Sequence, residues 1–225
     1  MESLPALHLA TMHRGAYLVG VAGGSGSGKT TLVRALRDLL PPESVCIVSQ
    51  DDYYLPIEQQ VKDANGKVNF DLPGALDLDL LAEDLRCLAS GEAVYRQEYN
   101  FNMATEPRWM EIRPARVILV EGLFLLQHPG LRELFDLKVF VEASEEIQLS
   151  RRTARDGRER GYAMADVLYQ WENHVMPAYR EHLLPYRNHC DLHVVNESNF
   201  ERALGVLRDH LMHKTGVPEF EALSA

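Results

Sequence analysis

Residues 23–30 have the types and spacing of a phosphate-binding loop. Their sequence, Gly-Gly-Ser-Gly-Ser-Gly-Lys-Thr, fits the pattern G-x-x-x-x-G-K-[ST] without a mismatch. Glycines let the backbone curl so that successive N–H groups point inward, and a helix beginning near Lys29 adds the positive end of its dipole. The Lys29 ammonium would neutralise the β- and γ-phosphates of a triphosphate, while the Thr30 hydroxyl would ligate a bridging Mg²⁺. The predicted nucleotide-binding residues are therefore Gly23, Gly24, Ser25, Gly26, Ser27, Gly28, Lys29, Thr30 and Thr31.

The segments on either side of this loop follow the order that such a site requires. Residues 17–22 are typical of a short buried strand, and residues 31–40 carry apolar side chains at helical spacing. A flexible Gly/Ser turn is the alternative, but a chance match in a chain of this length is expected only about once in a few hundred sequences. Nucleotide binding is the favoured interpretation.

Two acidic residues follow predicted strands. Asp51 comes after an apolar run at 45–48, and Glu121 directly follows one at 117–120. In open α/β sheets, ligands bind beyond the carboxyl ends of the strands. Asp51 is placed to act as the base for an alcohol acceptor, and Glu121 to hold Mg²⁺ through water. A carboxylate at a strand end is otherwise often a helix cap or part of a solvated turn, so these roles depend on the neighbouring phosphate loop.

Arginines are concentrated between residues 151 and 160 of a chain whose net charge is −10. Arg152 and Arg155 would share one face of a helix and could reach one polyphosphate. Taken alone, the cluster fits a solvated, salt-bridged helix end equally well. Combined with the phosphate loop, it predicts an arginine-rich lid over about 151–162 that closes over ATP and excludes water.

Aromatic residues gather in the segments that we expect around the acceptor. They are Tyr53, Tyr54, Phe70, Tyr99, Phe101 and Trp109. Aromatic side chains are more often core residues than ligand platforms, so their type alone assigns no role. The histidines at 174, 182, 189 and 193 lack metal-ligand spacing and are expected to be structural or exposed.

Strand-like runs alternate with helical patterns along the chain. We expect strands near 17–22, 45–48, 117–120, 137–141 and 192–195, and helices near 31–40, 77–90, 144–155, 164–181 and 200–213. This alternation predicts an α/β fold in which a parallel sheet of about five strands carries helices on both faces. Loose alternation over 94–101, followed by 109–112, predicts a β-hairpin flap at about 94–113.

The composition fits one domain in a reducing compartment. We expect a flexible tail over 1–14, a single domain over 15–215 and a C-terminal tail over 216–225. The acidic balance argues against a nucleic-acid partner or an anionic membrane surface. Three widely spaced cysteines suggest neither a disulfide framework nor a zinc site, and residues 1–14 lack the apolar core of a signal peptide. A cytoplasmic protein is expected.

Together these features resemble the uridine–cytidine kinase branch of the phosphoribulokinase/uridine kinase family of P-loop kinases. The resemblance runs from about residue 17 to 191. It rests on GGSGSGKT at 23–30, SQDDYY at 49–54, NFD with a proline at 69–73, Tyr99 with Phe101, EG at 121–122, and RRTARD and ERG within 151–161. It implies a P-loop NTPase fold and transfer of a phosphoryl group from ATP or GTP, with Mg²⁺, to the 5′-hydroxyl of a nucleoside, uridine or cytidine first.

The resemblance also implies roles for individual residues. Asp51 matches the catalytic base, and Lys29 is the second predicted catalytic residue. Arg155 matches a lid arginine that contacts phosphate, while Asp71 and Arg152 match residues that hold the ribose hydroxyls. The predicted acceptor-binding residues are Tyr54, Phe70, Asp71, Tyr99, Arg152 and Gln170.

Three positions depart from the family pattern near the expected nucleobase. Leu72 and Ala104 stand where the family has histidines, and Tyr162 stands where an arginine usually follows Glu-Arg-Gly. Loss of a hydrogen-bond donor from a specificity pocket changes discrimination by orders of magnitude. The reaction class is predicted to survive, while the acceptor stays open between a pyrimidine nucleoside and another nucleoside, sugar or sugar phosphate.

A nucleotide-binding switch without an acceptor is the alternative from another class. It needs no acidic base together with an aromatic pocket, so Asp51, Tyr54 and Asp71 argue against it. The guanine-reading N-K-x-D signature of GTPases is also missing. Family members are often oligomeric, and the sequence leaves a homo-oligomer open.

Overall fold

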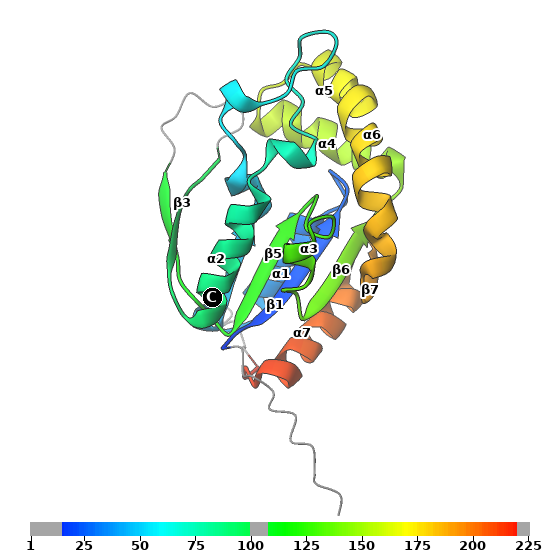
Figure 1. The fold of residues 1–225 in the computed structure, drawn as a ribbon. Coiled ribbons are helices and arrows are strands. Elements are labelled where there is room, and N and C mark those ends of the chain that lie inside the picture. The colour runs from blue at the N-terminus through cyan, green and yellow to red at the C-terminus, as the bar shows by residue number, and fades with distance from the viewer. Residues whose placement is uncertain (1–14, 100–107, 220–225) are drawn as a thin grey trace, which may run out of the picture.

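A five-stranded parallel sheet forms the centre of the fold. The structure, a computed structural model, describes residues 15–99 and 108–219. The strands lie in the order β2-β5-β1-β6-β7, and neighbouring strands are parallel (Figure 1). Their bounds are Tyr17–Gly23 (β1), Val45–Ser49 (β2), Val117–Gly122 (β5), Leu137–Glu142 (β6) and Leu192–Val195 (β7). The predicted α/β class and parallel sheet are confirmed. The predicted tail over 1–14, Phe101, Ala104 and residues 220–225 lie outside the described residues.

Helices cover both faces of the sheet because the strands are continuous apolar runs. In β5 all six residues are buried, as expected for a parallel strand packed on both sides. One face packs against α1 (Lys29–Asp38) and α7 (Glu201–Thr215). The other packs against α2 (Leu78–Ser90) and α3 (Pro129–Arg132). Val217, two residues past the predicted domain boundary, is only 3% exposed and belongs to the core beside α7.

The ends of α2 follow the sequence signals directly. Asp77 caps its first turn, because the Asp77 Oδ1 accepts a hydrogen bond from the Leu80 N–H at 2.9 Å. Gly91 ends it in the left-handed region, at φ 95°. The four-residue helix α3 was not predicted, since it is too short to display a period.

The helical segment over 164–189 is less regular than the single predicted helix. α5 (Met164–Gln170) continues through a π-helical turn (Trp171–Val175), α6 (Met176–Ala178), a second π-helical turn (Tyr179–Leu183) and a 3₁₀ turn (Leu184–His189). Proline has no N–H to donate and disturbs the regular ladder, and Pro177 lies within α6. α4 (Glu145–Glu159) precedes this segment and contains most of the arginine cluster. Within the described residues, no helix is long and apolar enough to cross a membrane.

The predicted hairpin is present beside α2. β3 (Val94–Gln97) and β4 (Trp109–Ile112) pair antiparallel in a sheet of their own (Figure 1). Both the Arg96 guanidinium and the Tyr53 hydroxyl hydrogen-bond the Asp84 carboxylate of α2, the latter at 2.7 Å. These contacts fix the base of the hairpin. The remaining short elements are 3₁₀ turns at Pro42–Ser44, Gln50–Tyr53, Ile57–Gln59 and Pro73–Ala75.

Candidate active site

Two glycines of the loop between β1 and α1 have no room for a side chain. Gly26 and Gly28 adopt φ values of 79° and 98°. A Cβ on Gly26 would lie 2.3 Å from the Gln148 carbonyl oxygen, and one on Gly28 would lie 2.3 Å from the Asn196 Nδ2. The same Nδ2 donates to the Ser27 carbonyl at 2.8 Å. The loop is therefore held in shape by α4 and by the residue after β7.

Lys29 lies buried at the first turn of α1. Its Nζ donates a hydrogen bond to the Gly24 carbonyl at 3.1 Å, across the loop. Burial lowers the pKa of Lys29, whereas the negative charges of Glu121 and Asp51 raise it. The ammonium thus faces both acidic residues that the sequence predicted at the strand ends.

Glu121 lies where β5 ends, beside the first turn of α1. Its Oε1 accepts hydrogen bonds from the Thr30 hydroxyl at 3.1 Å and from the Ser49 hydroxyl at 3.3 Å. Among the described residues no group of three or more His, Cys, Asp or Glu side chains could hold a metal. Mg²⁺ commonly takes one or two protein oxygens and completes its shell with water and substrate phosphates. This oxygen cluster fits that donor set, and Ser49 is a member that sequence reasoning missed.

Asp51 lies in the 3₁₀ turn that follows β2. The Ser49 hydroxyl accepts a hydrogen bond from the Asp51 N–H at 3.3 Å and so caps this turn. Burial raises the pKa of Asp51 to about 6, and the charge of Glu121 adds to the rise, while Lys29 and Arg160 oppose it. The carboxylate is therefore ionised at neutral pH but basic enough to accept a proton.

Three of the predicted aromatic residues form a cluster. The ring centroids of Tyr54 and Tyr99 are 4.9 Å apart, and Phe70 lies 5.6 Å from Tyr54 and 6.3 Å from Tyr99. Tyr53 and Trp109 do not join them: Tyr53 is buried in the core, and Trp109 is 64% exposed on β4. Tyr54 and Phe70 line the candidate acceptor site, whereas the predicted acceptor-binding residue Tyr99 packs against both rings without being part of that lining.

Arg152 connects the phosphate loop to the acceptor side. It is only 6% exposed, and its Nη1 donates to the Ser25 hydroxyl at 2.9 Å while its Nη2 donates to the Gln170 Oε1 at 3.0 Å. Asp71 lies nearby: burial raises the pKa of its carboxyl, and the charge of Arg152 lowers it. Arg152 is thus placed between the predicted phosphate and sugar sites.

A buried carboxylate that the sequence did not reveal holds the arginine cluster together. Asp156 is fully buried and forms ion pairs with Arg152 at 3.2 Å, Arg155 at 2.8 Å and Arg160 at 3.4 Å. A buried charge requires such partners. The arginines are therefore an organised group and not a solvated helix end.

One cavity joins the phosphate loop to the aromatic cluster. It is lined by predicted site residues, namely Ser25, Lys29, Thr30, Asp51, Tyr54, Phe70, Asp71, Glu121, Arg152, Arg155 and Gln170. It is also lined by residues to which no role had been given, namely Val68, Gly122, Leu123, Arg160, Tyr162 and His174. Tyr162, one of the departures from the family pattern, thus faces the site. Leu72 is half-buried outside this lining, and Ala104 lies outside the described residues.

Comparison with known proteins identifies the family. The model of the Phosphoribulokinase / Uridine kinase family matches residues 18–200. The chain belongs to this family. The uridine kinase of Ligilactobacillus salivarius is 33% identical over 196 residues, which cover 84% of this chain and 90% of that protein. The uridine kinase of Brevibacillus brevis is 34% identical over 200 residues, which cover 88% and 92%. The resemblance found in the sequence is confirmed, and the chain is a kinase.

Solved structures support the same fold. A possible uridine kinase from Bacillus stearothermophilus aligns with a TM-score of 0.56 at 20% identity, covering 82% of this chain and 91% of that one. Phosphoribulokinase from Rhodobacter spheroides aligns with a TM-score of 0.58 at 17% identity, covering 83% and 74%. At these identities the likeness shows the P-loop kinase fold alone.

Proposed function

We propose that this kinase transfers the γ-phosphoryl group of ATP to the 5′-hydroxyl of a nucleoside, with uridine or cytidine as the first candidates. The observation that carries the proposal is the single cavity that places Lys29 and Asp51 next to an aromatic cluster and next to Asp71. Relatives about 33% identical over most of the chain are uridine kinases, which supports the same acceptor class. We further propose one kinase domain that begins at 15 and runs past 215 to include the buried Val217, with a hairpin at 94–113 and an arginine-rich lid at 151–162 that lines this cavity.

The phosphate side of the cavity suits a nucleoside triphosphate. The loop N–H groups and the Lys29 ammonium would hold its phosphates, with Arg155 and Arg160 facing them from the other side. Mg²⁺ held by Thr30 and Glu121 would neutralise charge on the transferring group. ATP or GTP with Mg²⁺ is therefore the proposed donor.

Asp51 is the proposed base. It is ionised at neutral pH, and its raised pKa of about 6 allows it to take the proton of an attacking hydroxyl. Lys29, opposite it, would stabilise the negative charge that develops on the phosphoryl oxygens.

The acceptor side suits a ring attached to a polyhydroxy sugar. Tyr54, Phe70 and Tyr99 offer aromatic faces for a planar base. The Asp71 carboxylate can accept hydrogen bonds from two neighbouring sugar hydroxyls, and Arg152 can donate to their oxygens. This combination favours a nucleoside over a free sugar.

A different small hydroxyl compound is the second candidate acceptor, because the cavity is lined by a neutral phenol, Tyr162, where the family pattern has a charged arginine. A sugar phosphate fits less well. The segment near the hairpin offers only Arg96, Arg108 and Arg113 to a second phosphate, and of these Arg96 is held by Asp84 and Arg113 pairs with Glu111 at 2.8 Å. The cytoplasmic location and a homo-oligomeric state stay predictions.

Consumption of ATP with Mg²⁺ tests the proposal against nucleosides, pentoses and pentose phosphates, each compared with a blank without acceptor. We expect uridine or cytidine to accelerate ATP consumption, and the product to be the nucleoside 5′-monophosphate by mass spectrometry. Acceleration only by another acceptor would keep the mechanism and replace the substrate. Slow hydrolysis that no acceptor accelerates would support a nucleotide switch instead.

A further inference from the structure

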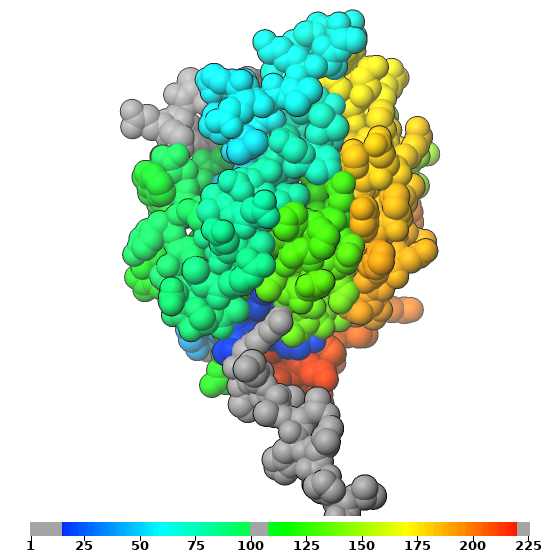
Figure 2. Space-filling view, in the orientation of Figure 1, coloured from blue at the N-terminus to red at the C-terminus, as the bar shows by residue number. Residues whose placement is uncertain are grey.

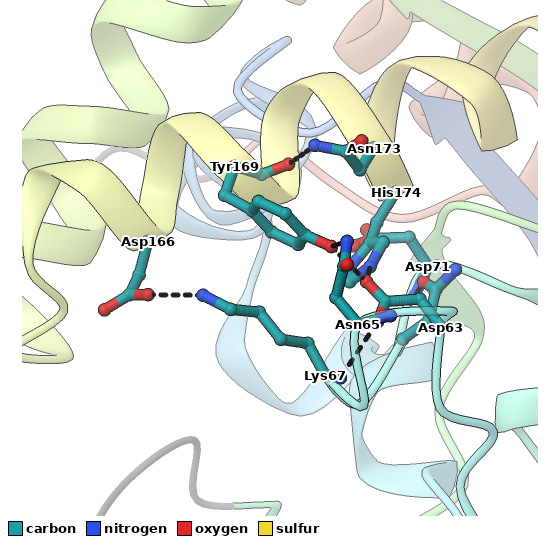
Figure 3. Close-up of polar contacts among 9 residues, drawn as sticks. Asp63, Asn65, Lys67, Asp71, Asp166, Tyr169, Asn173 and His174 are labelled. Atoms are coloured by element: carbon teal, nitrogen blue, oxygen red, sulfur yellow. Dashed lines mark hydrogen bonds and ion pairs between the residues drawn. The ribbon is translucent and has the colours of Figure 1, made fainter.

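The carboxylate of Asp63 forms hydrogen bonds on two sides. Its Oδ1 accepts from the N–H groups of Asn65 and Lys67, both at 2.9 Å, and thereby closes its own turn. Its Oδ2 accepts from the Tyr169 hydroxyl at 2.6 Å and bonds the His174 Nε2 at 2.8 Å (Figure 3). We call Asp63, Tyr169 and His174 the clasp, because they join the loop over 61–71 to the helical segment that begins with α5.

The clasp is largely buried, unlike an ion pair on the protein surface. The His174 side chain is 2% exposed and that of Asp63 is 17% exposed. The hydrogen bonds from Tyr169 and His174 hold the pKa of Asp63 well below its usual range, so the carboxylate stays ionised. Figure 2 shows the loop seated against α5 at the surface of the molecule. Hydrogen bonds to a charged acceptor are about twice as strong as neutral ones.

The loop leads from the clasp directly to the acceptor site. Its two arms are joined by a bridge between Lys62 and Val68 and by the hydrogen bond from the Asn69 N–H to the Val61 carbonyl at 2.8 Å. The next residues, Phe70 and Asp71, line the cavity. The placement of both side chains therefore depends on where this loop is held.

His174 also touches the site itself. It lines the same cavity as Asp71, and its electrostatic effect lowers the pKa of that carboxyl, against the raising effect of burial. It lies in a π-helical turn, a rare geometry that is frequent at functional sites. Its ring is thus fixed by Asp63 on one side and faces the proposed sugar site on the other.

We propose that the clasp positions Phe70 and Asp71 and so sets the affinity of the enzyme for its acceptor. Tyr169 and His174 are positioning residues in this proposal, which rests on the proposed nucleoside kinase activity. The donor side should respond much less, because the Asn196 Nδ2 holds the Ser27 carbonyl of the phosphate loop, and the link from Ser25 through Arg152 to Gln170 uses none of the clasp residues.

The experiment compares His174→Leu and Tyr169→Phe with the wild type and with a matched control. The control variant is Asp166→Asn, which removes the ion pair between Lys67 and Asp166. This pair joins the same two elements, but both of its side chains are about half exposed. Ion pairs between exposed side chains contribute little to stability. His174→Gln keeps a donor near the Nε2 position and should restore most of the lost function. Steady-state kinetics give the KM for acceptor and for ATP, and hydrogen exchange of the intact protein reports on backbone amides 61–71.

We expect both clasp variants to raise the acceptor KM by roughly ten- to a hundredfold, the effect of losing a hydrogen bond to a charged group. The KM for ATP should stay within twofold of the control, and exchange over 61–71 should accelerate. Tyr169→Phe removes one hydroxyl from a half-buried residue, so it tests the proposal even where His174→Leu fails to fold.

The proposal would be overturned if hydrogen exchange over 61–71 were unchanged in the clasp variants, or if their acceptor KM equalled that of Asp166→Asn. Equal rises in both KM values would do the same, because they would indicate general loosening. If the wild type phosphorylates no nucleoside, the proposed function fails, whereas exchange in the variants still decides whether the clasp holds the loop.

Discussion

Replacement of Asp51 by Asn should stabilise the protein while removing most of its activity. Because burial raises the pKa of Asp51 to about 6, the folded protein binds this proton more tightly than the unfolded chain does. The ionised carboxylate therefore destabilises the folded state above pH 6. This penalty shrinks as the pH falls from 6 towards the ordinary value of 3.8 and is absent below it.

The size of the effect follows from the pKa. A rise from 3.8 to about 6 corresponds to about 3 kcal/mol of unfolding free energy at pH 8, at about 1.4 kcal/mol per pKa unit. Solvent reaches Asp51 through the cavity, where its side chain is only partly covered. We therefore expect about 1–2 kcal/mol, or a rise in melting temperature of about 2–8 °C.

Thermal unfolding at pH 8 and pH 4 measures this effect, with Asp38→Asn as the control for loss of one negative charge at a site whose side chain is 63% exposed. The stabilisation by Asp51→Asn should appear at pH 8 and vanish near pH 4. Turnover at pH 8 should fall by about two to four orders of magnitude, and wild-type kcat/KM should fall about tenfold per pH unit below pH 6. Equal melting temperatures at pH 8 would refute the reasoning from burial, and retained turnover would remove Asp51 as the base.

Three further changes test other parts of the structure. Lys29→Ala should lower kcat in the ATP-consumption assay by about two to three orders of magnitude; near-normal turnover would contradict its role. Asp84→Asn should lower stability in urea by about 2 kcal/mol, because the buried carboxylate pairs with an Arg96 side chain that is 23% exposed; an unchanged midpoint would show that the hairpin is anchored elsewhere. Ala104→His, at a position outside the described residues, should raise kcat/KM on uridine, and no gain would indicate a more widely diverged pocket.

The elements that carry the chemistry were predictable because their signals are local. The phosphate loop, the strand before it and the helix after it occupy one continuous segment, and the order of residue types alone predicts their roles. Asp51 and Glu121 were predicted together because parallel strands end at one edge of a sheet. The register confirms that proximity, since Ser49 of β2 and Val21 of β1 both pair with Glu121.

The contacts that organise the acceptor site were not predictable, because their partners are far apart in the sequence. Asp63 and His174 are separated by 111 residues, and neither belongs to a motif. His174 was expected to be structural or exposed; its burial and its hydrogen bond to Asp63 agree with a structural histidine, whereas its position beside the cavity was not predicted. Asp156 was visible only as one acid in a basic stretch, and its burial follows from the packing of three arginines around it.

The phosphate side of the site is held by the central sheet, whereas the acceptor side is held by a loop. This difference explains how acceptor specificity can diverge while the reaction stays the same. Glu121 lies in β5, and Lys29 and Asp51 follow β1 and β2, so the buried sheet fixes their positions. The acceptor side is carried by the loop over 61–71 and by Tyr162, which polar contacts attach to the sheet only indirectly. A residue such as Tyr162 can change there without moving the groups that we propose for phosphoryl transfer. A changed acceptor with an unchanged mechanism is the divergence that this architecture permits most easily.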